Sequence, residues 1–333
     1  MKLILKQEII IDRNSQDMLL TKSKFDSNKI LFCYENFDSF LEIIIHDFNL
    51  NKTFYKLYEK VYIQHFYILS DFSIFIHREL DDDDKALLIS YTINPNNFEE
   101  KHLMGHLSKD FIINLYKITD YEDYFFMYSY EKTSQKSLYY IFDAKNNIIL
   151  EYLKEEELPY ERGTDIISFY TKNQEKFYCN YYQYKNYIYL IDKDNNKSEY
   201  SFENYYLYPF AITTTNSLVI AAGEPTTDYS DYVEKNNLIN IIIWNKKSKE
   251  IIYTYKGILF DNISGGPEKI YYFEKFNCLL MVSGIDYGKI SLRDLTKDEE
   301  IFTDYFSSLY VDEKNNKFGF YGENTYKIYE LLE

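Results

Sequence analysis

Cysteine, proline and glycine are scarce in this chain of 333 residues, which contains 3, 5 and 10 of them respectively. The three cysteines, Cys33, Cys179 and Cys278, lie far apart in the sequence and form no CxxC pair. A sparse, odd number of cysteines in a large domain indicates a reducing compartment rather than a disulfide framework. Each cysteine lies in an apolar segment, so we expect three reduced and mostly buried thiols.

The shortage of glycine also limits the chemistry that the chain can carry. Phosphate-binding loops use glycine so that the backbone can approach the anion, and neither GxGxxG nor GxxxxGK[ST] occurs. The motifs HExxH and GxSxG are absent as well. His102 and His106 are four residues apart, but outside a helix that spacing does not bring two imidazoles to one metal ion. The sequence therefore predicts no catalytic residue, no metal site and no cofactor.

Long apolar runs and excess positive charge are also missing. Lys6 and Glu8 interrupt the apolar N-terminal segment, and no stretch approaches the roughly 18 apolar residues of a membrane-spanning helix. The net charge is −16, from 53 acidic and 37 basic residues, which opposes binding to nucleic-acid backbones and to anionic membranes. We expect a cytoplasmic protein with no direct nucleic-acid or membrane contact.

Aromatic residues are abundant, at 19% of the chain, with 38 tyrosines and 25 phenylalanines. Aromatic and β-branched side chains suit a pleated, half-buried surface, so this composition favours strands. One pattern recurs: an alternating apolar strand, a polar residue at its end, and a turn rich in Asn, Lys and Asp. The equivalent positions are Asp47, Ile93, Asp143, Asp192, Asn245, Asp294 and Glu330. Their spacings are 46, 50, 49, 53, 49 and 36 residues, and a period near 50 is typical of a four-stranded propeller blade.

The two ends of the chain complement each other in this register. The last period stops at Glu333 after its third strand, whereas residues 2–11 form a strand that belongs to no period. Using that strand as the missing fourth strand leaves no unpaired sheet edge. We therefore predict an all-β fold with one domain over residues 1–333. It is a seven-bladed β-propeller of four-stranded antiparallel blades, with the ring closed by the N-terminal strand pairing with the last blade.

The strand end in ISLRDLTKDEEIF (290–302) resembles the third-strand signature of WD40-like repeats, in which an aromatic residue and Asp precede a tight turn. Trp244-Asn245 approaches the WD dipeptide, and Gly105-His106 is the only Gly-His pair. The polar tetrad that ties WD40 blades together is missing from most periods. The resemblance covers nearly the whole chain and implies a divergent WD40-like propeller.

Loop length suggests where such a fold binds a partner. Turns after the third strand of each period are short, whereas loops that leave the opposite face are long and varied, and insertions on one face mark a binding surface. Acidic residues steer protein partners, and tyrosine and arginine anchor them. The predicted partner-binding residues are Asp81, Asp82, Asp83, Asp84, Tyr160, Arg162, Asp228, Tyr229, Asp231 and Tyr232.

Two functions of different classes fit this sequence. The first is a non-catalytic protein-binding module, an adaptor or inhibitor, whose partner is a basic protein or a nucleic-acid-handling enzyme. The alternative is a propeller enzyme, a hydrolase or lyase, or a small-ligand binder with its site in the central funnel. The chain has only four scattered arginines, Arg13, Arg78, Arg162 and Arg293, which disfavours an anion-binding funnel. The sequence alone thus favours the protein-binding module.

Overall fold

The structure is a computed structural model, and parts of the chain are described in it. These are residues 1–11, 18–36, 40–58, 63–82, 85–97, 99–107, 111–117, 123–131, 136–146, 148–153, 166–170, 176–180, 187–191, 197–201, 206–207, 212–213, 217–223, 238–245, 248, 250–259, 269–283 and 288–333. Side chains are described for a part of these residues, mainly near the two ends of the chain.

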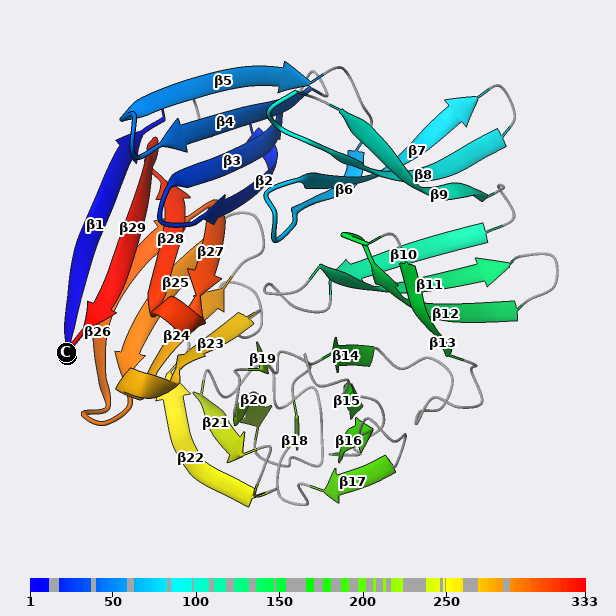
Figure 1. The fold of residues 1–333 in the computed structure, drawn as a ribbon. Helices are drawn as coiled ribbons and strands as arrows, with labels where there is room; N and C mark the ends of the chain where they lie inside the picture. The colour runs from blue at the N-terminus through cyan, green and yellow to red at the C-terminus, as the bar shows by residue number, and fades with distance from the viewer. Residues whose placement is uncertain are drawn as a thin grey trace.

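The first four sheets each hold four antiparallel strands that follow one another in the sequence (Figure 1). The first sheet contains β2 (Met18–Phe25), β3 (Lys29–Asn36), β4 (Leu41–Asp47) and β5 (Lys52–Tyr58). The second contains β6 (Ile63–Ile68), β7 (Ile74–Asp82), β8 (Lys85–Ile93) and β9 (Glu100–Leu107). The third contains β10 (Phe111–Lys117), β11 (Tyr124–Glu131), β12 (Lys136–Asp143) and β13 (Ile148–Leu153). The fourth contains β14 (Ile166–Tyr170), β15 (Lys176–Asn180), β16 (Tyr187–Ile191) and β17 (Lys197–Ser201).

Three more sheets complete the described part of the chain. The fifth contains β18 (Tyr206–Leu207), β19 (Ile212–Thr213), β20 (Ser217–Gly223), β21 (Leu238–Asn245) and β22 (Glu250–Leu259). The sixth contains β23 (Lys269–Phe273), β24 (Cys278–Ser283), β25 (Gly288–Asp294) and β26 (Glu299–Phe306), and the 3-10 turn η4 (Glu274–Phe276) connects β23 to β24. The seventh contains β27 (Ser308–Asp312), β28 (Lys317–Gly322), β29 (Thr325–Leu332) and β1 (Lys2–Ile10), and the 3-10 turn η5 (Glu313–Asn315) connects β27 to β28.

The sheets surround a common centre, so the fold is all-β and propeller-like. Figure 1 shows β2, β14 and β27 nearer the centre than β5, β17 and β1, their partners at the other side of the same sheets. In the described part of the chain, no helix is long and apolar enough to cross a membrane.

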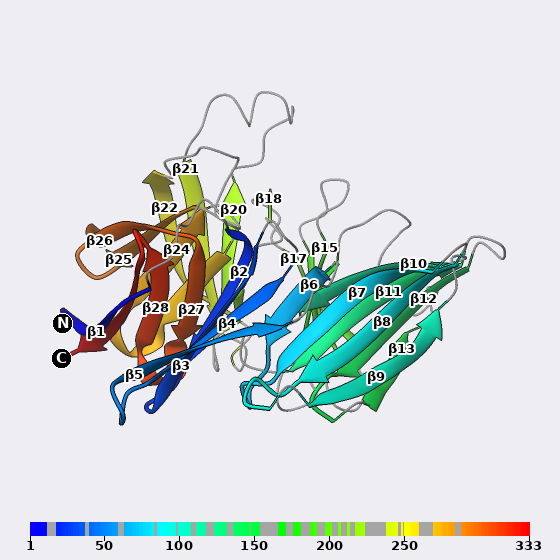
Figure 2. The same cartoon turned by 90° about the horizontal axis from the view of Figure 1, so that it is seen from above.

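The seventh sheet unites the two ends of the chain. β1 runs antiparallel to β29, from Lys2 opposite Leu332 to Ile10 opposite Thr325, with an irregularity between Leu5 and Gln7. Figure 2 shows the N- and C-termini side by side. β1 is the outermost strand of this sheet and most of its side chains are exposed, but Ile9 is only 7% exposed and packs into the core.

The recurrent polar residue lies at or near the end of the third strand of its sheet, and its position has a physical cause. Asp47, Asp143, Asp294 and Glu330 each lie opposite the first residue of the neighbouring second strand. The N–H of the next residue then donates to a carbonyl in the turn between the first and second strands. These bonds are Phe48 to Asn28 (2.8 Å), Ala144 to Asp123 (2.9 Å), Leu295 to Asn277 (3.0 Å) and Leu331 to Asn316 (2.9 Å).

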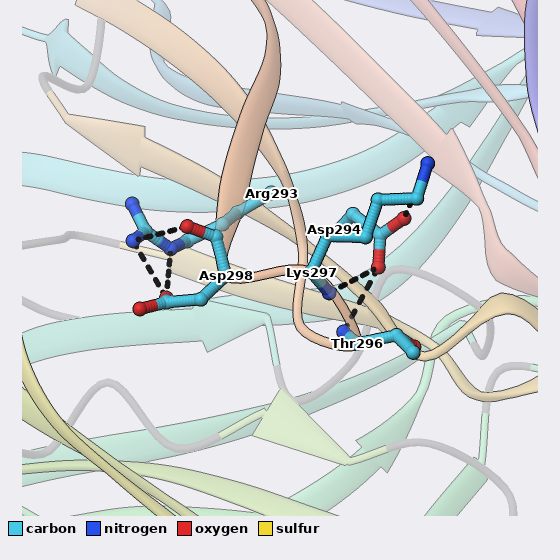
Figure 3. A network of polar contacts seen from close by, with 5 residues as sticks. All are labelled: Arg293, Asp294, Thr296, Lys297 and Asp298. Carbon is cyan, nitrogen blue, oxygen red and sulfur yellow. Dashed lines mark hydrogen bonds and ion pairs between the residues drawn. The ribbon is translucent and has the colours of Figure 1, made fainter.

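The side chain at this position also builds the turn that follows it. In Figure 3 the Asp294 carboxylate folds back over its own turn, where Oδ1 accepts from the N–H groups of Thr296 (2.9 Å) and Lys297 (3.3 Å). Arg293 closes the other side of the turn by donating to Asp298 Oδ1 at 2.7 Å. Asp47 and Asn245 accept equivalent bonds. Because Asp and Asn bond the backbone two or three residues ahead, they recur at these turns.

Apolar side chains fill the spaces between neighbouring sheets. Phe32 of the first sheet lies against Tyr321 of the seventh, with ring centroids 4.7 Å apart, whereas its neighbour Cys33 packs against the second sheet. Cys33 and Cys278 are free and buried, as the sequence predicts. Burial raises the pKa of the Cys278 thiol to about 12, so the thiol stays protonated. For Cys179 only the backbone, in β15, is described.

Ile9 and Ile10 form a matched pair that tests how much β1 contributes. We expect Ile9→Ala to lower the free energy of unfolding by about 2 to 4 kcal/mol, because it leaves a cavity between the seventh and first sheets. Ile10 is 73% exposed, so Ile10→Ala should change that energy by less than about 0.5 kcal/mol. Urea denaturation of both variants measures the difference, and equal effects would contradict a packing role for β1.

The turn in Figure 3 gives a second test. Asp294→Ala removes the acceptor of two backbone N–H groups and should cost about 1 kcal/mol of folding free energy. Asp294→Asn keeps an oxygen at the same place and should cost clearly less. Thermal melting of the two variants compares them, and an equal loss for both would show that the charge, rather than the acceptor, matters.

Candidate functional site

The most polar part of the described core lies where β2 meets β27, the innermost strands of the first and seventh sheets. Ser23 Oγ accepts one hydrogen bond from Ser308 Oγ at 2.8 Å and another from the Tyr326 hydroxyl at 3.0 Å. Thr21 Oγ1 donates to the carbonyl of Ser307, the residue just before β27. We call Thr21, Ser23, Ser307, Ser308 and Tyr326 the hydroxyl cluster.

The position of Tyr326 is set by close packing. A Cβ atom at Gly319 would lie 2.8 Å from Phe25 Cε1 and 2.9 Å from Tyr326 Cε1, so only glycine leaves room for these two rings. Tyr326 is completely buried, and this burial raises the pKa of its hydroxyl well above the ordinary value. The phenol therefore stays protonated and donates to Ser23 rather than acting as a base.

One member of the cluster makes no hydrogen bond. Among the described side chains, Ser307 Oγ is a buried oxygen without a partner. Buried hydroxyls in folded proteins are nearly always satisfied by protein, water or ligand, so this one is available to an incoming polar group. It lies beside Thr21, which bonds the carbonyl of the same residue.

Lys24 places a positive charge on the same strand as Ser23, on the opposite face of that strand. It follows Ser23 on β2 and is only 8% exposed. Its Nζ lies 5.5 Å from the ring centre of Tyr310 on β27 and 5.8 Å from that of Phe72 in the second sheet. Aromatic faces attract a cation, and low exposure strengthens its electrostatic interactions. A lysine that reaches rings of both neighbouring sheets lies on the inner side of its own sheet.

This arrangement is suited to holding an acidic ligand. An ammonium group and nearby hydroxyls provide the charge and the hydrogen bonds that a carboxylate or phosphate requires. No nucleophile with an adjacent base occurs in it, because Ser23 accepts from two protonated hydroxyls. Among the described side chains, no group of three His, Cys, Asp or Glu residues is placed to hold a metal ion.

A second polar junction links the second and third sheets, and its geometry indicates a structural role. Asp123 is buried and accepts from the Ser70 backbone N–H at 2.6 Å and from Ser70 Oγ at 2.5 Å. Lys145 Nζ donates to Ser70 Oγ at 3.4 Å. The Ser70 hydroxyl thus donates its hydrogen bond to a carboxylate. We interpret the contact as a link between two sheets, and Ser70 not as an activated nucleophile.

The predicted partner-binding residues are not brought together by anything that the structure describes. Asp81 and Asp82 end β7, where only their backbone is described. The other predicted residues lie outside the described parts of the chain, namely Asp83, Asp84, Tyr160, Arg162, Asp228, Tyr229, Asp231 and Tyr232. Their assignment stays a prediction.

Sequence reasoning missed the hydroxyl cluster and Lys24. A search for apolar strands passes over β2, whose residues Thr21 to Phe25 read TKSKF. Two hydroxyls alternating with two lysines just before an apolar strand were the available signal. The contacts with Ser308 and Tyr326 could not be read from it, because those residues lie at the other end of the chain.

No protein-family model matches this chain, and a search of curated proteins found no match either. Solved structures do resemble it. An oligogalacturonate lyase in complex with manganese matches with a TM-score of 0.57 and 9% identity, over 100% of this chain and 98% of that one. An uncharacterized protein from Listeria monocytogenes EGD-e has a TM-score of 0.57 and 13% identity, with 94% and 91% of the two chains covered.

Prolyl oligopeptidase B from Galerina marginata matches with a TM-score of 0.54 and 12% identity, over 94% of this chain. The match covers 46% of that protein, so this chain spans less than half of the peptidase. At these identities the likenesses show the fold alone. They support a propeller-like fold without assigning the chain to the WD40 family.

The comparisons correct the functional prediction. The sequence predicted a non-catalytic protein-binding module and no enzyme, because it contains no catalytic motif. Two of the three similar structures are enzymes, a lyase and a peptidase. The non-catalytic prediction is therefore wrong in treating the missing motif as decisive, since enzymes share this fold.

The hydroxyl cluster can be tested by its coupling. We expect Tyr326→Phe to lower the free energy of unfolding by about 1 to 2 kcal/mol, because Ser23 loses a buried donor. Ser308→Ala should cost a similar amount, and the double variant less than their sum, since both donate to one oxygen. Tyr305→Phe is the control, because Tyr305 is 54% exposed. Strictly additive losses in chemical denaturation would contradict a shared network.

Proposed function

We propose that the seven sheets are the blades of one domain and that the pairing of β1 with β29 closes its ring. We further propose that the chain is an enzyme with its site in the central funnel. The innermost strands β2 and β27 support this location, because they carry a buried lysine and a set of buried hydroxyls. Buried polar groups are costly unless satisfied, and among the described side chains Ser307 Oγ, just before β27, is buried without a partner.

The reaction class that we propose is elimination by a lyase acting on an acidic oligosaccharide. The support is the match to the oligogalacturonate lyase, which covers nearly the whole of both chains. The prolyl oligopeptidase contains more than half of its length beyond the match.

The residues at β2 and β27 supply the charge stabilisation that such an elimination requires. In the reaction a base removes the proton next to the sugar carboxylate, negative charge develops on that carboxylate, and the C–O bond to the leaving sugar breaks as the C=C double bond forms, so that the leaving sugar departs with a proton on its oxygen. Lys24 supplies a positive charge of low exposure, and the free hydroxyl of Ser307 supplies an additional hydrogen-bond group. The scarcity of arginine does not exclude an anion site, because Lys24 can take that role. The unpartnered Ser307 hydroxyl, which lies just before β27 in a residue bonded to Thr21 of β2, is the observation that carries the proposal.

A second candidate is a small-ligand binder that uses the same residues without catalysis. The full bonding of Ser23 and the protonated state of Tyr326 favour it, since neither group is available as a base. The two candidates differ in outcome, because a binder saturates with an acidic oligosaccharide and releases no product.

The activity is tested by incubating the purified protein with oligogalacturonates and following the ultraviolet absorbance of the unsaturated product. We expect product formation, a loss of at least about tenfold in Lys24→Met, and little change in Lys275→Met, an exposed lysine of η4. Saturable binding measured by calorimetry without product would favour the second candidate. The absence of both binding and product with oligogalacturonates would contradict the proposed substrate class.

A further inference from the structure

The outer strands of the seven sheets are β1, β5, β9, β13, β17, β22 and β26, and in the described part of the chain no strand pairs with their outer edges. Such an edge is a template for a further strand, and the charges on it favour some partners over others. β5 and β26 differ most in charge. β5 contains two lysines and no acidic residue, whereas β26 contains three acidic residues and no basic one.

The backbone groups that point outward on β5 follow from the hydrogen bonds of its sheet. The Phe48 N–H donates to a carbonyl in the turn before β3 at 2.8 Å, so the N–H of the preceding Asp47 points the other way, toward β5. Asp47 lies opposite Lys52, so the backbone of Lys52 faces β4. Because these directions alternate along a strand, the backbone groups of Thr53 and Tyr55 point outward.

The same reasoning gives the outward groups of β26. The Leu295 N–H donates to a carbonyl in the turn before β24 at 3.0 Å, and β24 pairs with β25 without irregularity. The backbone of Ile290 therefore faces β26, where it lies opposite Asp304. The neighbours of Asp304, which are Thr303 and Tyr305, then point their backbone groups outward. Accordingly the Tyr305 N–H donates to the Asp304 side chain, at 2.8 Å, rather than to β25.

We propose that β5 of one copy of this chain pairs antiparallel with β26 of a second copy, with Thr53 opposite Thr303. This register brings the outward backbone groups of the two strands together. It also gives three pairs of opposed side chains, which are Lys52 with Asp304, Phe54 with Phe302, and Lys56 with Glu300. Opposite charges and aromatic rings that face each other across antiparallel strands stabilise the pairing.

The charges also exclude the pairing of like edges. Two β5 strands would bring lysines together with no carboxylate between them, and two β26 strands would bring carboxylates together with no cation. Like charges at a contact suppress that contact. Each copy instead offers one basic and one acidic edge, so the contact is head to tail and the assembly can extend from either side. The inference is independent of the proposed catalytic function.

Self-association of the full chain is measured by sedimentation over a range of concentrations. Each copy has a net charge of −16, so the measurement is made at about 0.15 M salt, where repulsion beyond about 8 Å is screened. We expect association that increases with concentration. Lys52→Glu should weaken it by at least about tenfold, because this change places like charges opposite each other. A monomeric wild type at every soluble concentration would overturn the inference.

Lys2→Glu is the matched control for Lys52→Glu. Lys2 is also an exposed lysine of an outer strand, β1, and the substitution changes the net charge by the same amount. It should associate as the wild type does. Equal losses in Lys2→Glu and Lys52→Glu would show that net charge, and not the β5 edge, governs association, and would overturn the assignment.

Two proline variants test the head-to-tail geometry. Proline is tolerated where an edge N–H faces solvent, but it removes the donor that a further strand needs. Thr53→Pro and Thr303→Pro should therefore each be monomeric, with thermal melting as the control for folding. Mixed together, they should form a 1:1 dimer and nothing larger, because one intact β5 and one intact β26 remain. Mixed variants that stay monomeric, although both fold, would overturn the proposed pairing.

A peptide test uses the unaltered protein. A synthetic peptide of residues 299–306 should dissociate the wild-type assembly by occupying β5. An assembly that the peptide leaves intact would contradict the role of β5. A wild type that binds the peptide but never self-associates would also overturn the inference, because β5 would then serve an acidic strand of another protein.

Discussion

The whole architecture depends on one constraint: sheets that are apolar on both faces must be covered on both faces. In the first sheet, Phe32 and Tyr34 pack toward the seventh sheet, whereas Leu31 and Cys33 pack toward the second. A sheet of this kind is stable only between two others, because apolar area on each face must leave water. The sixth and seventh sheets share a core in the same way. Sheets placed side by side around a common centre cover one another's faces, and this is the arrangement of the first, second, sixth and seventh sheets.

The same constraint determines where polar chemistry can occur. Between the sheets the space is filled by rings such as those of Phe318 and Tyr329, whose centroids are 5.5 Å apart, so polar side chains are tolerated there only in satisfied networks. The turns use their Asp and Asn side chains to complete their own backbone hydrogen bonds. The inner edges of the sheets remain, and that is where Ser23, Lys24 and Ser308 lie.

Much of the fold could be predicted because its signals are local and repeated. Each of the four residues Asp47, Asp143, Asp294 and Glu330 lies at the same register position in its own sheet, so a spacing read from the sequence located equivalent positions of the third strands. β2 was not predicted because its lysines and hydroxyls interrupt the apolar pattern. The turns η4 and η5 were not predicted because each is a single turn. Asn277 and Asn316, which close these turns with φ of 50° and 55°, were the available signal, since asparagine tolerates the left-handed region.

The candidate sites could not be predicted because the fold builds them from residues that are distant in the sequence. Thr21 and Ser23 meet Ser307, Ser308 and Tyr326 only after the first and seventh sheets pack together. A catalytic motif of fixed spacing requires its residues to share one helix or loop, and a propeller-like fold instead presents residues of several sheets to a common centre. The absence of a motif in such a chain therefore says little about catalysis, and the geometry of the innermost strands is the better evidence.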